Sequence, residues 1–198
     1  MKPVEALTYP LGRLLRSRRA DESLSPSHWP ILETEGVLTL ESLSWGDGEE
    51  IPAAHCGFAI GENISPELSW SPGPEGTKTY LLFLEDIDAP QREPGIHTAV
   101  VIPASVTDLP EASLSDKAKA SSLGVIFVPT VLGLSKYSGP RPLPGHGAHR
   151  YRFHIYALDF VPEGIDLQKL KWVLDKVKNE SGKVLAHGAL QTFRRDLN

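Results

Sequence analysis

The residues most able to do chemistry lie in the segment Asp86-Ile87-Asp88-Ala89-Pro90, directly after the most hydrophobic stretch of the chain. If that stretch is a strand that continues through Asp88, both carboxylates lie on one of its faces. Two carboxylates at the end of a buried strand are costly unless they are paired or functional. Aspartate and proline are also common in turns, so a turn is the alternative interpretation.

A second polar group follows a loop rich in glycine and proline at residues 138–147. At the start of the strand expected after it, His149 and Tyr151 point one way and Arg150 points the other. The imidazole and the phenol can therefore face one pocket, while Arg150 can pair with a carboxylate of a neighbouring strand. Free N–H groups of the stiff loop can form an anion-binding nest. A structural histidine beside a surface loop is the alternative interpretation.

His97 begins another expected strand soon after the acidic segment. A hairpin with residues 91–95 as its loop returns His97 to the side of Asp86 and Asp88. Such a site can bind an anion, or it can perform acid–base catalysis with His97 or His149 as base and an aspartate orienting it. These side chains also suit zinc, but nothing in their spacing requires a metal, so we predict neither a metal nor a cofactor.

The elements that must position these residues are short strands separated by Pro, Gly and Asp. The segment 79–86 is apolar on both faces, which indicates a central, buried strand. Further strands are expected at 36–40, 97–102, 124–128, 151–158 and around 190–193, and helical segments at 5–19, 166–179 and 183–188. The pattern predicts a mainly β protein with an N-terminal helix and short helices near its C-terminal end.

The expected N-terminal helix is amphipathic and basic. Four leucines fall on one face and four arginines cluster near its end: Leu7, Leu11, Leu14, Leu15, Arg13, Arg16, Arg18 and Arg19. Helices of this kind bind anionic lipid in some proteins. We expect instead that the leucine face packs on the body of the fold. Pro10 lies inside the segment and can split the helix.

Composition narrows the classes of function. The chain has 198 residues, which suits one domain, and its net charge of -5 argues against a nucleic-acid partner. It has no apolar run long enough to span a membrane and no secretory signal pattern, so a cytoplasmic protein without integral membrane contact is predicted. The single cysteine, Cys56, cannot form an internal disulfide, and His55 beside it points elsewhere on a strand, so a buried, incidental thiol is predicted.

Several segments together resemble the phosphatidylethanolamine-binding protein (PEBP) family, in its bacterial-type, Raf kinase inhibitor-like branch. In the family's order, these are Gly61-Glu62-Asn63-Ile64-Ser65-Pro66-Glu67-Leu68-Ser69-Trp70, Asp86 to Pro90, His97, Tyr137 to Pro144, His149-Arg150-Tyr151 and Tyr156-Ala157-Leu158-Asp159. The resemblance runs from about residue 38 to residue 194. It implies a PEBP-like antiparallel β-sandwich over residues 36–198, preceded by a partly helical extension at 1–35.

The resemblance also implies a pocket for phosphate, acetate or phospholipid headgroups. Carried over residue by residue, that pocket is formed by Asp86, Asp88, His97, Gly139, Pro140, His149 and Tyr151, with Arg141 at its rim. The aromatic residues that usually flank the pocket histidine are Ile96 and Thr98 here, and Leu143 replaces a proline of the loop. An altered wall and the added charge of Arg141 favour a different ligand, larger or carboxylated.

Two functions remain open from the sequence. One is a module that binds a small anionic or oxygen-rich ligand, with a possible protein partner. The other is an enzyme of a small-molecule pathway that uses His97, His149 and Asp86 on a carboxylated or carbonyl substrate, since some fungal members of the family are associated with natural-product pathways. The sequence sets no oligomeric state.

Overall fold

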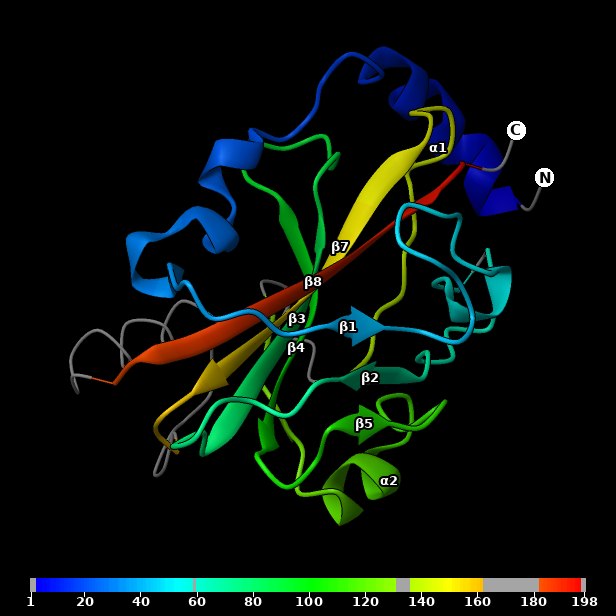
Figure 1. Ribbon diagram of the computed structural model, residues 1–198. Helices are drawn as coiled ribbons and strands as arrows, with labels where there is room; N and C mark the ends of the chain where they lie inside the picture. The colour runs from blue at the N-terminus through cyan, green and yellow to red at the C-terminus, as the bar shows by residue number, and fades with distance from the viewer. Residues whose placement is uncertain (1–2, 59, 131–135, 162–181, 197–198) are drawn as a thin grey trace.

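Two antiparallel sheets make up most of the structure, a computed structural model that describes residues 3–58, 60–130, 136–161 and 182–196 (Figure 1). The larger sheet has the strand order β6-β4-β3-β7-β8 and the smaller one β1-β2-β5. The predicted mainly β sandwich is confirmed. The strands are β1 (Leu40–Glu41), β2 (Leu68–Trp70), β3 (Thr79–Asp86), β4 (Gly95–Pro103), β5 (Asp108–Leu109), β6 (Ile126–Phe127), β7 (His149–Leu158) and β8 (Val184–Arg194).

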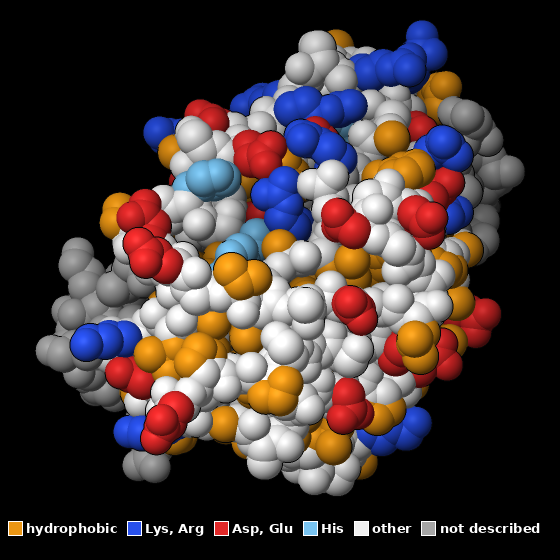
Figure 2. Space-filling view, viewed as in Figure 1, with side chains coloured by type: hydrophobic (Ala, Val, Ile, Leu, Met, Phe, Trp, Pro, Cys, Tyr) orange, Lys and Arg blue, Asp and Glu red, His pale blue; other side chains and the backbone are white. Residues whose placement is uncertain are grey.

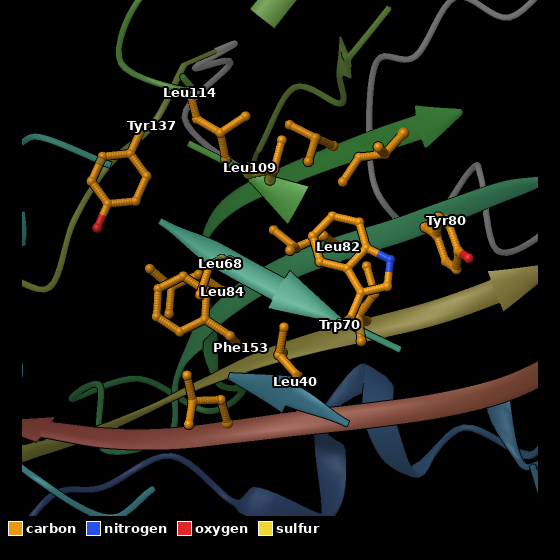
Figure 3. Close-up of a cluster of buried hydrophobic side chains, with 14 of the residues drawn as sticks. Leu40, Leu68, Trp70, Tyr80, Leu82, Leu84, Leu109, Leu114, Tyr137 and Phe153 are labelled. Atoms are coloured by element: carbon orange, nitrogen blue, oxygen red, sulfur yellow. The ribbon is translucent and has the colours of Figure 1, made fainter. Parts of the chain in front are cut away.

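Strand β3 is the central strand, as its two-sided apolar pattern predicts. It pairs with β4 on one side and β7 on the other, and all its residues are buried. Leu82 and Leu84 belong to the core between the sheets, together with Leu68 of β2 (Figure 3). Leu81 and Phe83 belong to a second cluster, on the other face of the large sheet. Because β3 is packed on both faces and paired on both edges, its last residue, Asp86, is held firmly in place, and the candidate site begins there.

The N-terminal helix differs from the prediction. α1 spans Pro3–Leu14, so it ends earlier than predicted, and Pro10 lies inside it without splitting it. Its leucines do not pack on the body of the fold: Leu7, Leu11 and Leu14 are exposed. The physical reason is that α1 approaches the body through Gly12, where a Cβ atom would collide with the backbone oxygen of Pro144. The face of α1 that carries Gly12 therefore points toward the body of the fold, and the leucines point outward.

The remaining helices are short. They are α2 (Lys117–Ser122) and the 3-10 helices η1 (Glu22–Leu24), η2 (Pro26–His28), η3 (Pro30–Leu32) and η4 (Ala53–His55). The helix predicted at 166–179 lies outside the described residues. No helix in the described part of the chain is long and apolar enough to cross a membrane.

Three predicted segments need correction, and one of them is the strand expected at 124–128, of which only β6 (Ile126–Phe127) is present. The helical turn expected at 183–188 is wrong, because residues 184–188 belong to β8 and most of them pair with β7. That pairing joins segments far apart in the chain and overrides the weak local preference. The strand expected at 36–40 is shorter, since only β1 (Leu40–Glu41) is a strand there and Val37 makes an isolated bridge to His187.

The segment before residue 36 is tied to the outer face of the large sheet. Leu32 packs in the cluster that contains Leu81 and Phe83, and the hydroxyl of Ser25 donates to the carboxylate of Glu85. The division into an extension at 1–35 and a domain at 36–198 stays a prediction.

Candidate functional site

Asp86 and His149 form the buried centre of the candidate site. They end β3 and begin β7, which are neighbours in the sheet. Nδ1 of His149 lies 2.8 Å from Oδ2 and 3.0 Å from Oδ1 of Asp86. Because both side chains are almost fully buried, the pair is shielded from water, where such interactions are strong.

A chain of hydrogen bonds extends this centre to His146 and to the N-terminal segment. The backbone oxygen of Arg18 can only accept, so Nε2 of His146 donates to it at 2.9 Å. Burial and the positive charge of Arg19 lower the pKa of His146, so its ring is neutral and its Nδ1 accepts. Nδ1 of His146 faces both Nε2 of His149, 2.6 Å away, and a guanidinium nitrogen of Arg19, 2.7 Å away. Asp86, His149 and His146 therefore form one hydrogen-bonded chain that reaches the backbone of Arg18.

His97 is brought to the same centre by a bulge in β4. Leu84 pairs with Thr98 but Glu85 pairs with Ile96, so His97 is the extra residue. Bulges of this kind re-aim side chains next to functional sites. Nδ1 of His97 donates to the backbone oxygen of Gly139 at 3.2 Å, which leaves its Nε2 facing Asp86.

A gap separates His97 from Asp86. Nε2 of His97 lies 3.9 Å from Oδ2 of Asp86, too far for a direct hydrogen bond. Polar atoms at this separation are commonly bridged by a water or a ligand group. The side chain of His97 is 19% exposed and that of Asp86 is 6% exposed. His97 is therefore the histidine of the site that a ligand can touch, while both nitrogens of buried His149 are engaged.

Tyr151 forms the floor of the site. Its ring lies edge-on to His97, with ring centroids 5.5 Å apart, and its hydroxyl accepts from the backbone N–H of Arg141 at 3.1 Å. Burial, and then the charge of Asp86, raise the pKa of the phenol well above its usual value. The hydroxyl thus stays protonated, and its proton is directed to the carboxylate of Asp86. The side chain of Arg141 is exposed at the rim.

Asp88 does not share this centre, contrary to the prediction. β3 ends at Asp86, and the turn that follows sends Asp88 toward Arg150. Nε and NH2 of Arg150 donate to its two carboxylate oxygens at 2.9 and 3.1 Å, and Arg19 lies 3.6 Å away. Burial would raise the pKa of Asp88, but the hydrogen bonds and charge of Arg150 outweigh it and the pKa is lowered. The predicted pairing of Arg150 with a carboxylate is therefore present, and it occupies Asp88.

The loop at 138–147 is not an open nest for an anion. Its N–H groups donate within the protein: Gly139 to Asn63, Arg141 to Tyr151, and both Gly145 and Gly147 to the carboxylate of Asp196. Its prolines have no N–H to offer. Gly139 and Pro140 are buried and form part of the wall, so an anion at this site would depend on side chains.

Other candidate features lie apart from this centre. A cavity of about 500 Å³ lies between β1 and β8, lined by residues that include Leu40, Trp45 and Leu190. Among the described residues, His55, Glu67 and Glu111 place metal-type ligand atoms within 4.8 Å of one another. Both nitrogens of His55 already contact other groups, the backbone oxygen of Ile64 and the hydroxyl of Ser44.

Cys56 matches its prediction as a buried thiol. Burial raises its pKa to about 11, and its sulfur donates to the backbone oxygen of Pro52. A thiol that holds its proton this firmly is a poor nucleophile.

Sequence reasoning missed three residues around the site. His146 links His149 to Arg18, and its position three residues before His149 is a signal that could have been used. Arg19 reaches the ring of His146 at 2.7 Å from a distant part of the chain, and Asn63 anchors Gly139. These two contacts depend on the folded chain and leave no local pattern.

A second buried network lies on the opposite face of the large sheet. Nε2 of His154 donates to Glu85 at 2.8 Å, and Nε2 of His187 donates to Nδ1 of His154 at 3.0 Å. Burial would raise the pKa of Glu85, but hydrogen bonds and charge from His154 and a hydrogen bond from Ser25 lower it. Burial is the main cause that lowers the pKa of His154. This network consists of an ionised carboxylate and two neutral histidines, sealed by the N-terminal segment.

Comparison with known proteins covers most of the chain. A family profile described as phosphatidylethanolamine-binding protein matches residues 41–192. A UPF0098 protein of Aquifex aeolicus (strain VF5) is 32% identical over 162 residues, which cover 81% of this chain and 90% of the relative. A fungal relative named Phomoidride biosynthesis cluster protein B is 29% identical over 208 residues, which cover 93% of this chain and 92% of the relative.

Solved structures share the same fold. The crystal structure of Escherichia coli YbcL, described as a new member of the mammalian PEBP family, has a TM-score of 0.67 and 28% identity, covering 81% of this chain and 99% of YbcL. A putative PEBP homologue from Chlamydia trachomatis has a TM-score of 0.65 and 24% identity, covering 80% of this chain and 97% of its own.

Proposed function

The chain belongs to the phosphatidylethanolamine-binding protein family, and from that premise we propose that it binds a small anionic or oxygen-rich ligand between His97 and Asp86. The observation that carries the proposal is the 3.9 Å gap between Nε2 of His97 and Oδ2 of Asp86, at the partly exposed end of an otherwise buried network. A ligand hydroxyl or carboxyl group placed there would hydrogen-bond to both side chains.

The charge of the site supports an oxygen-rich ligand. Nδ1 of His149 lies 2.8 Å from the carboxylate of Asp86, and an N–H donated there offsets part of the negative charge that an incoming anion would meet. Asp88 is neutralised separately by Arg150. The contacts of the loop N–H groups lie within the protein, so the donors left for an anion are the guanidinium of Arg141 and, when its ring carries both protons, Nε2 of His97.

Calorimetry with inorganic phosphate and with acetate tests the proposal. We expect His97→Ala to weaken binding about tenfold to a hundredfold, the effect of losing one charge-assisted hydrogen bond. Asp86→Asn should weaken it by a similar factor. His28→Ala is the control, because His28 is exposed and outside the site. If both site variants bind as tightly as the wild type, the ligand site lies elsewhere.

A catalytic use of the same site is the second candidate. It is favoured by the similarity, over nearly the whole chain, to a protein named for a fungal biosynthesis cluster. In that case His97 would be the general base, because its Nδ1 is held by Gly139 and its Nε2 is accessible. Asp86 and His149 would hold a proton beside it and act as the acid.

The two candidates separate under one assay. The protein is incubated with a small-molecule extract of its source organism, and mass changes are followed. Catalysis predicts conversion that falls roughly 10²–10⁴-fold in His97→Ala with the fold intact. If the wild type converts nothing but retains a compound tightly, the enzyme hypothesis fails and binding stands.

A further inference from the structure

An outward-facing stripe of leucines runs along α1. Leu7 is 83% exposed, Leu14 is 79% exposed and Leu11 is 49% exposed. Their spacing of three and four residues places them on one face of the helix. Single exposed leucines are ordinary, but three in one stripe, on a helix at the end of the molecule, form a continuous apolar surface.

The packing of α1 holds this stripe outward. Gly12 is buried against the backbone of Pro144, and Gly145 lies against the backbone oxygen of Tyr9 and against Arg13. Rotating the helix to bury the leucines would bring larger side chains against the same backbone. The exposed stripe is therefore a consequence of how α1 docks on the loop at 138–147.

Positive charge lies at the C-terminal end of the stripe. Arg13, Arg16 and Arg18 are exposed, and none of them pairs with a carboxylate among the described residues. Figure 2 shows Lys and Arg side chains gathered at the end of the molecule that carries α1, with hydrophobic side chains among them. The whole chain has a net charge of -5, so this basic end is a local feature.

From this combination we propose that α1 lies on an anionic lipid surface, with its leucines in the boundary between headgroups and acyl chains. An apolar face flanked by arginines is the pattern of helices that lie in the membrane interface. Leucines supply the insertion, and each arginine near an anionic surface contributes about fivefold to binding. The helix has 12 residues, which suits lying on a membrane and is too short to cross one.

A second copy of the chain fits this surface less well. A stable protein–protein interface needs about 800 Å² from each partner, well beyond three leucines. Joining two such faces would also bring the arginines of both copies close together, and the repulsion between like charges would disfavour the dimer. The proposal is independent of the ligand between His97 and Asp86, because α1 presents its leucines away from that site.

Co-sedimentation with vesicles tests the proposal, using the full chain. Vesicles of phosphatidylcholine alone are compared with vesicles of phosphatidylcholine and phosphatidylserine, with no phosphatidylethanolamine in either. We expect binding to the anionic vesicles, and we expect it to weaken as salt is added. The double variant Leu7→Ser/Leu14→Ser should lose binding at least tenfold. Arg16→Gln/Arg18→Gln should lose it by roughly 25-fold at low salt.

Two controls keep the result specific. Leu43→Ser removes a leucine that is 95% exposed but far from α1 in sequence, and it should bind like the wild type. Asp86→Asn alters the ligand site and should also retain vesicle binding. Because Leu7, Leu14, Arg16 and Arg18 are all exposed, thermal unfolding should show both double variants folded.

Other outcomes overturn the proposal. The proposal is contradicted if the wild type does not bind anionic vesicles at low salt. It is also contradicted if Leu7→Ser/Leu14→Ser binds these vesicles as well as the wild type. If size-exclusion chromatography gives a dimer that Leu7→Ser/Leu14→Ser converts to a monomer, and vesicles are not bound, the stripe is an interface between two copies.

Discussion

Glu85 and Asp86 are neighbours at the end of β3, yet their carboxylates lie on opposite faces of the large sheet, and each contacts a histidine of β7. His154 on one face and His149 on the other each contact a further histidine. The alternation of side chains along a strand creates this arrangement. The network at Glu85 is sealed by the N-terminal segment, whereas the one at Asp86 reaches solvent through His97.

The pair Asp88–Arg150 is predicted to stabilise the fold and not to hold the ligand. Asp88→Ala leaves Arg150 without its main partner and should cost about 1–3 kcal/mol in the free energy of unfolding. Urea denaturation measures this. Glu22→Ala is the control, since Glu22 is 36% exposed against 10% for Asp88, and its ion pairs with Arg150 and Arg152 should contribute less than about 1 kcal/mol. Equal decreases in the free energy of unfolding in the two variants would show that the burial of Asp88 adds nothing to the strength of its ion pair.

The partly buried position of His187 leads us to expect that the free energy of unfolding falls in acid. Burial, followed by the charges of His154 and Arg152, lowers its pKa to about 4. Its pKa in the folded state lies below that of an unfolded histidine, about 6.5, so the stabilisation is complete above that pH and is lost as pH falls from about 6.5 through 4. The loss should be about 2 kcal/mol, reduced for partial exposure.

The measurement is thermal unfolding at pH 7 and pH 4. The variant His187→Gln keeps a donor toward His154 but cannot be protonated, so it should lose less stability between the two pH values than the wild type. His28→Gln, at an exposed position, should behave like the wild type. An identical loss in all three proteins would mean that other groups cause the acid sensitivity.

Gly139→Ala should damage the ligand site through the backbone. The added Cβ would collide with the backbone oxygen of His55, which cannot move aside easily. The loop would shift and carry away the carbonyl that holds Nδ1 of His97, so ligand affinity should fall about tenfold. Gly95→Ala is the matched control, because a Cβ there meets only ordinary contacts at 3.5 Å and beyond. Calorimetry that finds no difference between the two would contradict this role of Gly139.

Leu82→Ala should destabilise the fold by roughly 2–5 kcal/mol, because it empties a fully buried position between the two sheets. Leu43→Ala changes the same side chain at an exposed position and should stay within about 0.5 kcal/mol. Chemical denaturation of the two variants checks the difference. A loss below about 1 kcal/mol at Leu82 would mean that the core can collapse around the change.

Much of the large sheet was predictable because its strands carry strong local patterns. β3 was predicted with its observed bounds, and β4 and β7 to within two residues. β8 was missed at residues 184–188 because its pairing partner, β7, lies far away in the chain.

The site was predictable in outline only. Alternation along β7 placed His149 and Tyr151 together, and the hairpin placed His97 near Asp86. The separation of Asp88 depends on where β3 stops, and the engagement of the loop N–H groups depends on Asn63 and Asp196, which come from other parts of the chain. Periodicity within one segment cannot report such partners.

Both ends of the chain converge on the loop at 138–147. α1 packs against it near Pro144, and Asp196, just beyond β8, accepts from Gly145 and Gly147; Figure 1 draws the two termini close together. An affinity tag or a fluorophore fused to either end would therefore sit beside the loop that carries His146. A fluorophore at either terminus should respond to changes in that loop, and ligand binding should be compared with and without the tag. The same proximity allows a circular permutant in which a short linker joins the ends and new termini open elsewhere.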